Sequence, residues 1–301
     1  MKKSLYAIGC AALISASSAF AQEGMFNHWL PEGWSADVVA AVKFTRMDYH
    51  NWQEGGTSAS TWLFTYDASV KRAGEVADWS AKVNLALGQT WTDGYGKRKS
   101  DDKIFLETMG DFNTSKTVKP YLGARFESQF MKSYEYSEDA DGNEIRNDIS
   151  CFMDPAYITQ MVGIGFFPAE DLRVGGKLGG RVWFSTRLGF ANRMTVSHGY
   201  GYADDPDTDK FEKFKDEPGL ESVTEFKYTF ENLITFKSRL WGFVNFKGVE
   251  EIDGKWENLL SFAFSPLFEF QFGFDMAYDK DLDKDAQSKS MILVGVTWRW
   301  F

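Results

Sequence analysis

The segment from Phe268 to Tyr278 constrains the fold more than any other, because apolar and polar residues alternate along it without a break. Phenylalanine occupies four alternate positions, and Glu269 and Asp275 lie among the intervening residues. Side chains of a β-strand point alternately to opposite faces, so this strand has one apolar face and one polar face. Phenylalanines form the core of a soluble barrel or sandwich, but they face lipid in a membrane barrel with a polar lumen. Alternation alone leaves both arrangements open.

The first 21 residues are typical of a secretory signal peptide. Lys2 and Lys3 precede an apolar run that is too short for a membrane anchor, and small residues flank Phe20 before Gln22. Cleavage before Cys10, as in a lipoprotein, would leave an even shorter apolar region and is the weaker alternative. We therefore predict a signal peptide over residues 1–21, a periplasmic segment over 22–34 and a barrel domain over 35–301.

Composition and charge narrow the fold class further. Aromatic residues make up 17% of the chain, yet no run of about 18 apolar residues follows the signal, which excludes helical membrane spans. The net charge of −10 argues against nucleic acid as a partner. An exported, aromatic-rich chain with strong alternation is typical of an outer-membrane β-barrel surrounded by lipid and lipopolysaccharide. We therefore predict an all-β, antiparallel transmembrane β-barrel located in the cell outer membrane.

About twelve alternating segments follow the signal. We expect strands over residues 36–48, 59–72, 78–92, 102–112, 117–131, 155–167, 171–185, 221–231, 233–247, 255–265, 267–279 and 289–301. One set of alternate connections is short, at 73–77, 113–116, 168–171, 232 and 265–266. The other set is longer, at 50–57, 93–101, 132–154, 186–220, 248–254 and 280–288. This pattern predicts short periplasmic turns and long external loops, with both termini periplasmic.

The last strand carries a second mark of membrane barrels. Gly295, Trp298 and Trp300 resemble the C-terminal signal through which the barrel-assembly machinery recognises outer-membrane proteins. The resemblance implies that this machinery is a partner during biogenesis.

Short motifs in a fixed order resemble a known family. They are Asn51–Gly56, Lys99–Asp102, Ser128–Phe130, Ile149–Ser150, Pro155–Tyr157, Trp256–Glu257 and Tyr278–Asp279. Their order is similar to that in a bacterial domain-of-unknown-function family, number thirty seventy-eight. The resemblance implies an outer-membrane barrel and leaves the activity open.

Catalytic and metal-binding constellations are sparse. Histidine occurs only at His28, His50 and His198, and there is no G-x-S-x-G motif. A lipid-modifying barrel enzyme is therefore a minor alternative, and we predict no catalytic residue and no cofactor. Alternate aspartates over 279–285 are spaced like the first ligands of a calcium loop, but Lys284 takes the position of the essential glycine. We predict no dedicated metal site.

The predicted lumen is the candidate functional site. Inward positions of neighbouring strands would form a basic strip of Arg125, Arg173, Lys177 and Arg181, with the small residues Gly163 and Gly165 between them. Acidic residues Glu257, Glu269 and Asp275 would lie elsewhere around the ring. Opposed charges across an aqueous path suggest a narrow channel for small polar or anionic solutes. The alternative is a closed structural or surface-interaction barrel, in which basic residues pair with Glu107, Asp111 and Glu127, and the external loops carry the function. A barrel of about twelve strands permits either.

Overall fold

A closed antiparallel barrel of twelve strands dominates the computed structural model. The structure describes residues 30–47, 58–139, 144–174, 179–199, 213–231, 233–248, 252–265, 267–278 and 286–299. The barrel strands are β1 (Trp34–Met47), β2 (Ala59–Arg72), β3 (Ala77–Thr92), β4 (Gly96–Phe112), β5 (Val118–Ser128), β8 (Ala156–Arg173), β9 (Arg181–Val196), β10 (Phe214–Phe230), β11 (Ile234–Asn245), β12 (Ile252–Ala263), β13 (Phe268–Tyr278) and β14 (Gln287–Arg299). A separate hairpin of β6 (Ser133–Glu138) and β7 (Glu144–Ser150) is inserted between β5 and β8.

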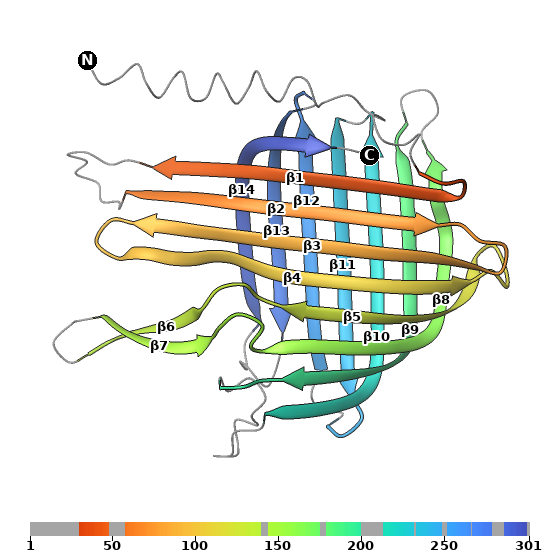
Figure 1. The fold of residues 1–301 in the computed structure, drawn as a ribbon. Helices are drawn as coiled ribbons and strands as arrows, with labels where there is room; N and C mark the ends of the chain where they lie inside the picture. The colour runs from red at the N-terminus through yellow and green to blue at the C-terminus, as the bar shows by residue number, and fades with distance from the viewer. Residues whose placement is uncertain are drawn as a thin grey trace.

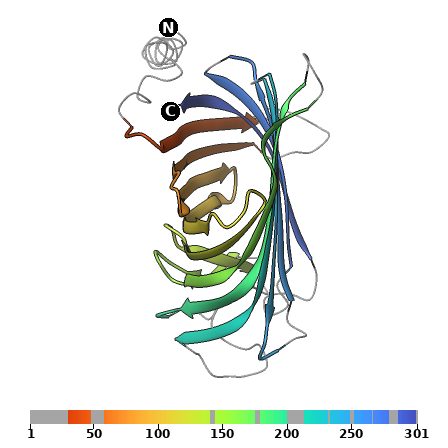
Figure 2. The same ribbon diagram turned by 90° about the vertical axis from the view of Figure 1, so that its right-hand side faces the viewer.

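The barrel strands are strongly tilted. In Figure 1, strands β1 to β5 of the near wall run across strands β9 to β14 of the far wall, and Figure 2 shows the two walls from the side. Tilts of about 35–45° are needed to close a sheet into a barrel, and they make the strands of opposite walls cross steeply. Among the described residues, no helix is long and apolar enough to cross a membrane.

The alternation of short and long connections follows the prediction. The connections at 73–76, 113–117, 174–180, 231–233 and 264–267 lie at one end of the barrel, which we call the short-turn end. The connections at 48–58, 129–155, 197–213, 246–251 and 279–286 lie at the other, external end, where the β6–β7 hairpin also projects (Figure 1). One external connection is shorter than predicted: β4 begins at Gly96, so a turn of residues 93–95 replaces the expected loop over 93–101. Gly94 and Gly96 adopt positive φ there, which glycine does without steric cost.

The predicted strand over 171–185 is wrong. Strand β8 continues through the expected turn at 168–171 and ends at Arg173, and β9 occupies residues 181–196, most of which were predicted as loop. Pro168 and two acidic residues suggested a turn, but the β8–β9 pairing shifts register on both sides of Ala169. Such irregularities let a strand accommodate a proline that cannot donate to the ladder.

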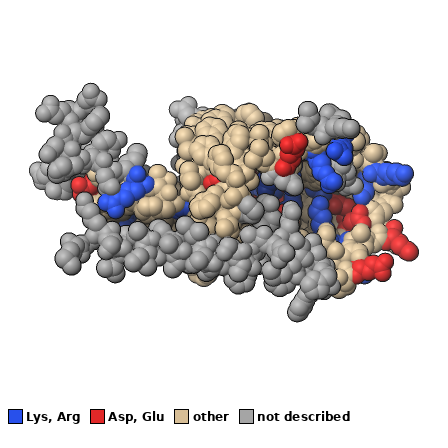
Figure 3. Space-filling model, turned by 90° about the horizontal axis from the view of Figure 1, so that it is seen from above, with Lys and Arg blue, Asp and Glu red and all other residues tan. Residues whose placement is uncertain are grey.

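Apolar side chains face outward, as predicted. Phe268 and Phe272 of β13 are each 41% exposed, whereas Gln271 between them is 9% exposed. The same contrast holds in β9, where Leu188 and Phe190 are exposed and Arg187 is buried. Most charged side chains visible from above lie toward the two ends of the molecule, and the middle of the described surface is mainly uncharged (Figure 3). An apolar outer band around a polar interior is the arrangement of a transmembrane barrel.

The ring closes through a short seam between its first and last strands. Val39–Lys43 of β1 pair with Gly295–Arg299 of β14, and among the described residues these five residue pairs are the fewest between any neighbouring barrel strands. Behind the seam, the ammonium group of Lys43 donates a hydrogen bond to the side-chain oxygen of Gln271 on β13. The seam therefore rests on few ladder bonds and a buried polar contact.

Candidate functional site in the barrel lumen

A buried arginine forms the centre of the lumen. The guanidinium of Arg125 on β5 donates two hydrogen bonds to Glu107 on β4, at 3.0 and 3.1 Å, and two to Glu221 on β10, at 2.8 and 3.3 Å. The side chains of Arg125, Glu107 and Glu221 are only 3%, 5% and 2% exposed. Arginine suits this position because its planar fork can bind two carboxylates at once.

Further ion pairs reach across the lumen from this centre. Lys82 on β3 lies 2.9 Å from Glu225 on β10, and these strands are five places apart in the ring of twelve. Arg239 on β11 contacts both Glu225, at 3.3 Å, and Glu107, at 3.4 Å. Opposite walls of the barrel are therefore joined directly by side chains.

Similar cross-lumen contacts occur at other depths. Lys103 on β4 lies 3.1 Å from Glu257 on β12, and these two strands are six places apart, which is the full width of the ring. This contact joins opposite walls of the barrel at a second position.

The two ends of the lumen are also bridged. Toward the external end, Arg193 on β9 pairs with Asp253 on β12 at 2.8 Å. Toward the short-turn end, the ammonium of Lys71 on β2 lies 5.8 Å from the ring centre of Trp183 on β9. Contacts between non-adjacent strands thus occur toward both ends of the barrel as well as at its centre.

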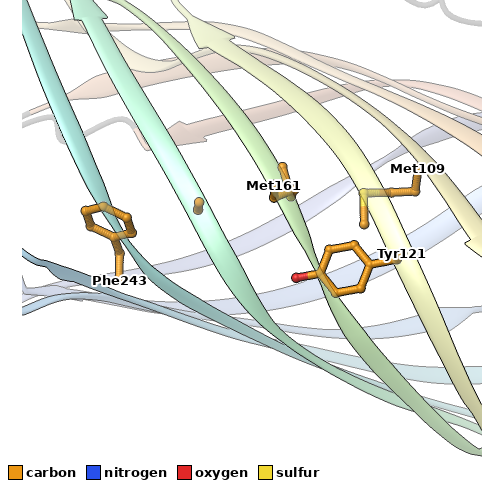
Figure 4. Packing of buried hydrophobic residues seen from close by; sticks show 5 residues of the cluster. Met109, Tyr121, Met161 and Phe243 are labelled. Carbon is orange, nitrogen blue, oxygen red and sulfur yellow. The ribbon is translucent and has the colours of Figure 1, made fainter.

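An apolar cluster fills the space beside the ion pairs. It comprises Met109, Tyr121, Met161, Ala191 and Phe243. Figure 4 shows the side chains of Met109, Tyr121, Met161 and Phe243 on their strands. The Tyr121 ring reaches over β9 because Gly189 leaves room for it: a Cβ at that position would lie 2.6 Å from the tyrosine hydroxyl. Pairing large residues with inward-facing glycines is how a small barrel packs its interior.

Little space remains at the centre. The cavity beside Arg125 has a volume of about 10 Å³ and is lined by Glu107, Met109, Tyr121, Met161, Arg187, Glu221, Val223 and Glu225 as well as Arg125 itself. That is roughly the space of a single water molecule. The described side chains therefore leave little space beside Arg125.

The predicted basic strip is not continuous, which corrects the sequence-based interpretation. Arg125 lies at the lumen centre, but Arg173 and Arg181 pair in register with each other, both exposed, at the short-turn end. Lys177 lies outside the described residues. The strip was wrong because the strand boundaries between β8 and β9 were misplaced, which put these arginines too deep in the barrel.

The three acidic candidates differ in their contacts. Glu257 contacts Lys103 and also Lys255, the latter at 3.2 Å. Glu269 accepts a hydrogen bond from the hydroxyl of Thr297, at 3.2 Å. Asp275 is the ladder partner of Glu257 on one side and of Lys289 on the other. Glu257 is thus paired with two lysines, whereas Glu269 binds a hydroxyl and Asp275 lies beside both an acidic and a basic residue.

Several central residues were missed by the sequence interpretation. They are Lys82, Lys103, Glu221, Glu225 and Arg239. The signal that could have identified two of them is the alternation over 217–225, where glutamate recurs at every fourth residue on one face of β10. Its first part was assigned to a loop, so the inward face of β10 was not recognised. Of the three acidic residues in the alternative, Glu107 binds Arg125 and Asp111 lies 3.1 Å from Arg187, whereas Glu127 is in register with Tyr157 of β8.

The remaining sequence candidates have simple outcomes. Gly295 pairs with Lys43 and Glu269, and Trp298 is in register with Ala40, so both lie at the closing seam. Trp300, His28, His50 and the aspartate-rich residues 279–285 lie outside the described residues. Within the described ranges, no group of three or more His, Cys, Asp or Glu residues is placed to hold a metal ion.

A second concave site lies at the external end, where the β6–β7 hairpin adjoins the tip of the β3–β4 hairpin. We call it the external groove. Its volume is about 320 Å³, and it is lined by Gln89, Lys97, Arg98, Lys99, Met131, Lys132, Tyr134 and Tyr136. Arg98 holds the hairpin in place: its guanidinium lies 4.1 Å from the ring centre of Tyr136 and pairs with Glu144 on β7. Beside this contact, the hydrogen bond that Glu144 accepts from Arg146 lowers the pKa of the Glu144 carboxyl.

Part of the chain is similar to a known protein family. A family described as "Protein of unknown function (DUF3078)" matches residues 44–134. Three of the sequence motifs, namely Asn51–Gly56, Lys99–Asp102 and Ser128–Phe130, lie inside that range. No match to this sequence was found among the curated proteins.

Several solved structures are similar to this chain at low sequence identity. The translocator domain of autotransporter NalP from Neisseria meningitidis has a TM-score of 0.39 and 11% identity, covering 98% of this chain and 96% of that one. The COG4313 outer membrane channel from Pseudomonas putida F1 has a TM-score of 0.40 and 9% identity, covering 90% and 96%. The NanC porin has a TM-score of 0.38 and 9% identity, covering 86% and 98%. The chain itself forms a closed antiparallel β-barrel, and over residues 44–134 it is similar to a protein family of unknown function, as its motifs predicted.

Proposed function

We propose that this protein is a closed barrel that acts at the cell surface through its external face, and that it does not conduct solutes. The observation that carries the proposal is the direct contact between opposite walls, above all Lys103 with Glu257 and Lys82 with Glu225. A conducting lumen needs a continuous water-filled path, whereas here the charged groups that would line it bind each other.

Opening this lumen by side-chain motion alone is energetically expensive. A solute passing the centre would have to separate Arg125 from Glu107 and Glu221, and removing one partner of such a buried pair costs about 3–5 kcal/mol. The narrow channel for small polar or anionic solutes is the second candidate, because ionisable side chains do line the interior. It requires the central network to rearrange as a unit.

The external face has long connections and a projecting hairpin that could form a binding surface. The longest connections lie at this end, and the β6–β7 hairpin extends the surface beyond the barrel wall (Figure 1). Binding sites are commonly carried by loops that a rigid scaffold positions, and a closed barrel is such a scaffold. We therefore assign the barrel a supporting role and the external face the interacting role.

Planar-bilayer recording tests the proposal. The wild-type protein should give no discrete conductance steps. A variant in which Lys82, Glu107, Glu225 and Arg239 are all changed to serine keeps the strands but removes the central bridges, so it should conduct and thereby show that inserted protein is detected. Stable steps from the wild type, altered in ion selectivity by Glu257→Gln, would establish the channel and overturn the closed-barrel proposal.

A further inference from the structure

We infer that the external groove binds a saccharide carrying a phosphate or carboxylate group. This inference deepens the proposed function, on which it rests, by naming the class of ligand recognised at the external face. It stands on three observations: the charge of the groove, the arrangement of its tyrosines and its size.

The groove is cationic in a chain that is acidic overall. Four of its eight lining residues, Lys97, Arg98, Lys99 and Lys132, carry positive charge, and none of the eight is acidic. The chain as a whole has a net charge of −10. A local concentration of cations against that background attracts anions selectively to this place.

The basic residues of the groove differ in whether they already form ion pairs with acidic residues. Lys132 pairs with Asp148 at 2.9 Å, and Lys99 pairs with Asp102 at 3.3 Å. Lys97 is exposed at the end of β4 and has no ion pair with any residue that the structure describes. Exposed ion pairs exchange readily with a competing anion because each is worth only about 0–1 kcal/mol. Lys97 and Lys132 are therefore the expected anion contacts.

The tyrosines favour a sugar over a flat aromatic ligand. The ring of Tyr136 is already covered by Arg98, whereas Tyr134 is 37% exposed. The two tyrosine rings are tilted by 55° with centres 6.2 Å apart, so they do not form the parallel slot that would clasp a flat base. One open aromatic face beside several cations fits the apolar face of a pyranose ring whose anionic substituent reaches the lysines.

The size of the groove agrees with a small ligand segment. Its volume of about 320 Å³ is at the lower end of the roughly 300–1,000 Å³ range of small-molecule sites. Anionic sugars at the external end come from two sources, the lipopolysaccharide of the same membrane and free acidic saccharides outside it. Both present the same chemistry to the groove.

Binding measurements on the refolded full-length protein test the inference. The probes are glucose 6-phosphate and glucuronate, with glucose as the neutral match, followed by saturation-transfer NMR and calorimetry. We expect both anionic sugars to bind, glucose to bind at least tenfold more weakly, and Lys97→Gln/Lys132→Gln to weaken the anionic sugars at least tenfold. Tyr134→Ala should weaken both classes of sugar. Lys116→Gln is the matched control, because Lys116 is an exposed lysine in a short-turn connection.

Two vesicle compositions distinguish lipopolysaccharide from free saccharides as the ligand. The protein is reconstituted either in phosphatidylethanolamine vesicles or in vesicles that also contain lipopolysaccharide. If glucose 6-phosphate binds only in the first, lipopolysaccharide occupies the groove; equal binding in both identifies free saccharides as the ligand. The inference is overturned if Lys97→Gln/Lys132→Gln leaves the affinity for the anionic sugars unchanged, or if glucose binds as tightly as they do. In that case, the absence of conductance steps in bilayer recording would still support the closed barrel. Conductance with intact groove binding overturns only the closed barrel.

Discussion

Replacing Arg125 with methionine removes the charge at the centre of the lumen while keeping a long apolar side chain. The two carboxylates it binds are left in different situations. Glu107 still has Arg239 at 3.4 Å and Lys82 at 3.7 Å. Glu221 is only 2% exposed, and among the ion pairs of the described residues Arg125 is its one partner. The substitution therefore leaves one buried carboxylate without compensation.

The size of the effect follows from that inventory. An ion pair broken on one side in a buried site costs about 3–5 kcal/mol, because the remaining charge keeps its desolvation penalty. Arg125→Met should lower the free energy of unfolding by about this amount. Adding Glu221→Gln should restore most of it, since a neutral amide is far less costly to bury than a carboxylate.

Equilibrium urea unfolding in phospholipid vesicles, followed by tryptophan fluorescence, measures these differences. Lys132→Met is the matched control, because its ion pair with Asp148 is exposed and should contribute only about 0–1 kcal/mol. If Arg125→Met costs no more than Lys132→Met, the central carboxylates are hydrated. The lumen would then be wet, and the reasoning for a closed barrel would be refuted.

Three other perturbations test separate features. Gly189→Ala should destabilise the barrel by about 1–3 kcal/mol in the same urea assay, because its Cβ meets both the backbone of β8 and the hydroxyl of Tyr121; a smaller loss would mean that the tyrosine repositions freely. Phe272→Arg should cost about 2–4 kcal/mol if that side chain faces lipid near the bilayer middle, and a neutral effect would place it in water. The Glu144 carboxyl, observed by NMR with ¹³C-labelled glutamate, should titrate below its ordinary pKa of 4.5. Its pair is present above that pH and lost as the pH falls through the lowered pKa, and Arg146→Ala should move the pKa back up.

The sequence predicted the barrel well because alternation is a local property. The outward face of β13 and the order of short and long connections depend only on which residues are neighbours in the chain. The error between β8 and β9 arose where this local signal conflicts with another one. Pro168 and its acidic neighbours read as a turn, and only the pairing with β9 shows that the strand continues past them.

The state of the lumen depends on contacts that no local pattern reports. The charges of Lys103 and Glu257 are visible in the sequence, but 154 residues separate them, and their contact depends on ring position and strand tilt together. An error of a few residues in one strand boundary moves every inward charge along the axis. This is why Arg173 and Arg181 were expected beside Arg125 and lie instead at the short-turn end.

The short seam between β1 and β14 bears on how the barrel is made. Most neighbouring strands are also consecutive in the chain, so their hairpins can form as soon as both strands exist. The seam instead joins the two sequence extremes of the sheet, and loop-closure entropy disfavours such a distant contact until the rest has formed. Until the seam forms, the sheet has two unpaired edges, and within the described residues five residue pairs join them. An assembly factor that binds those two strand edges during insertion therefore has to release them along only a short stretch of β1–β14 pairing.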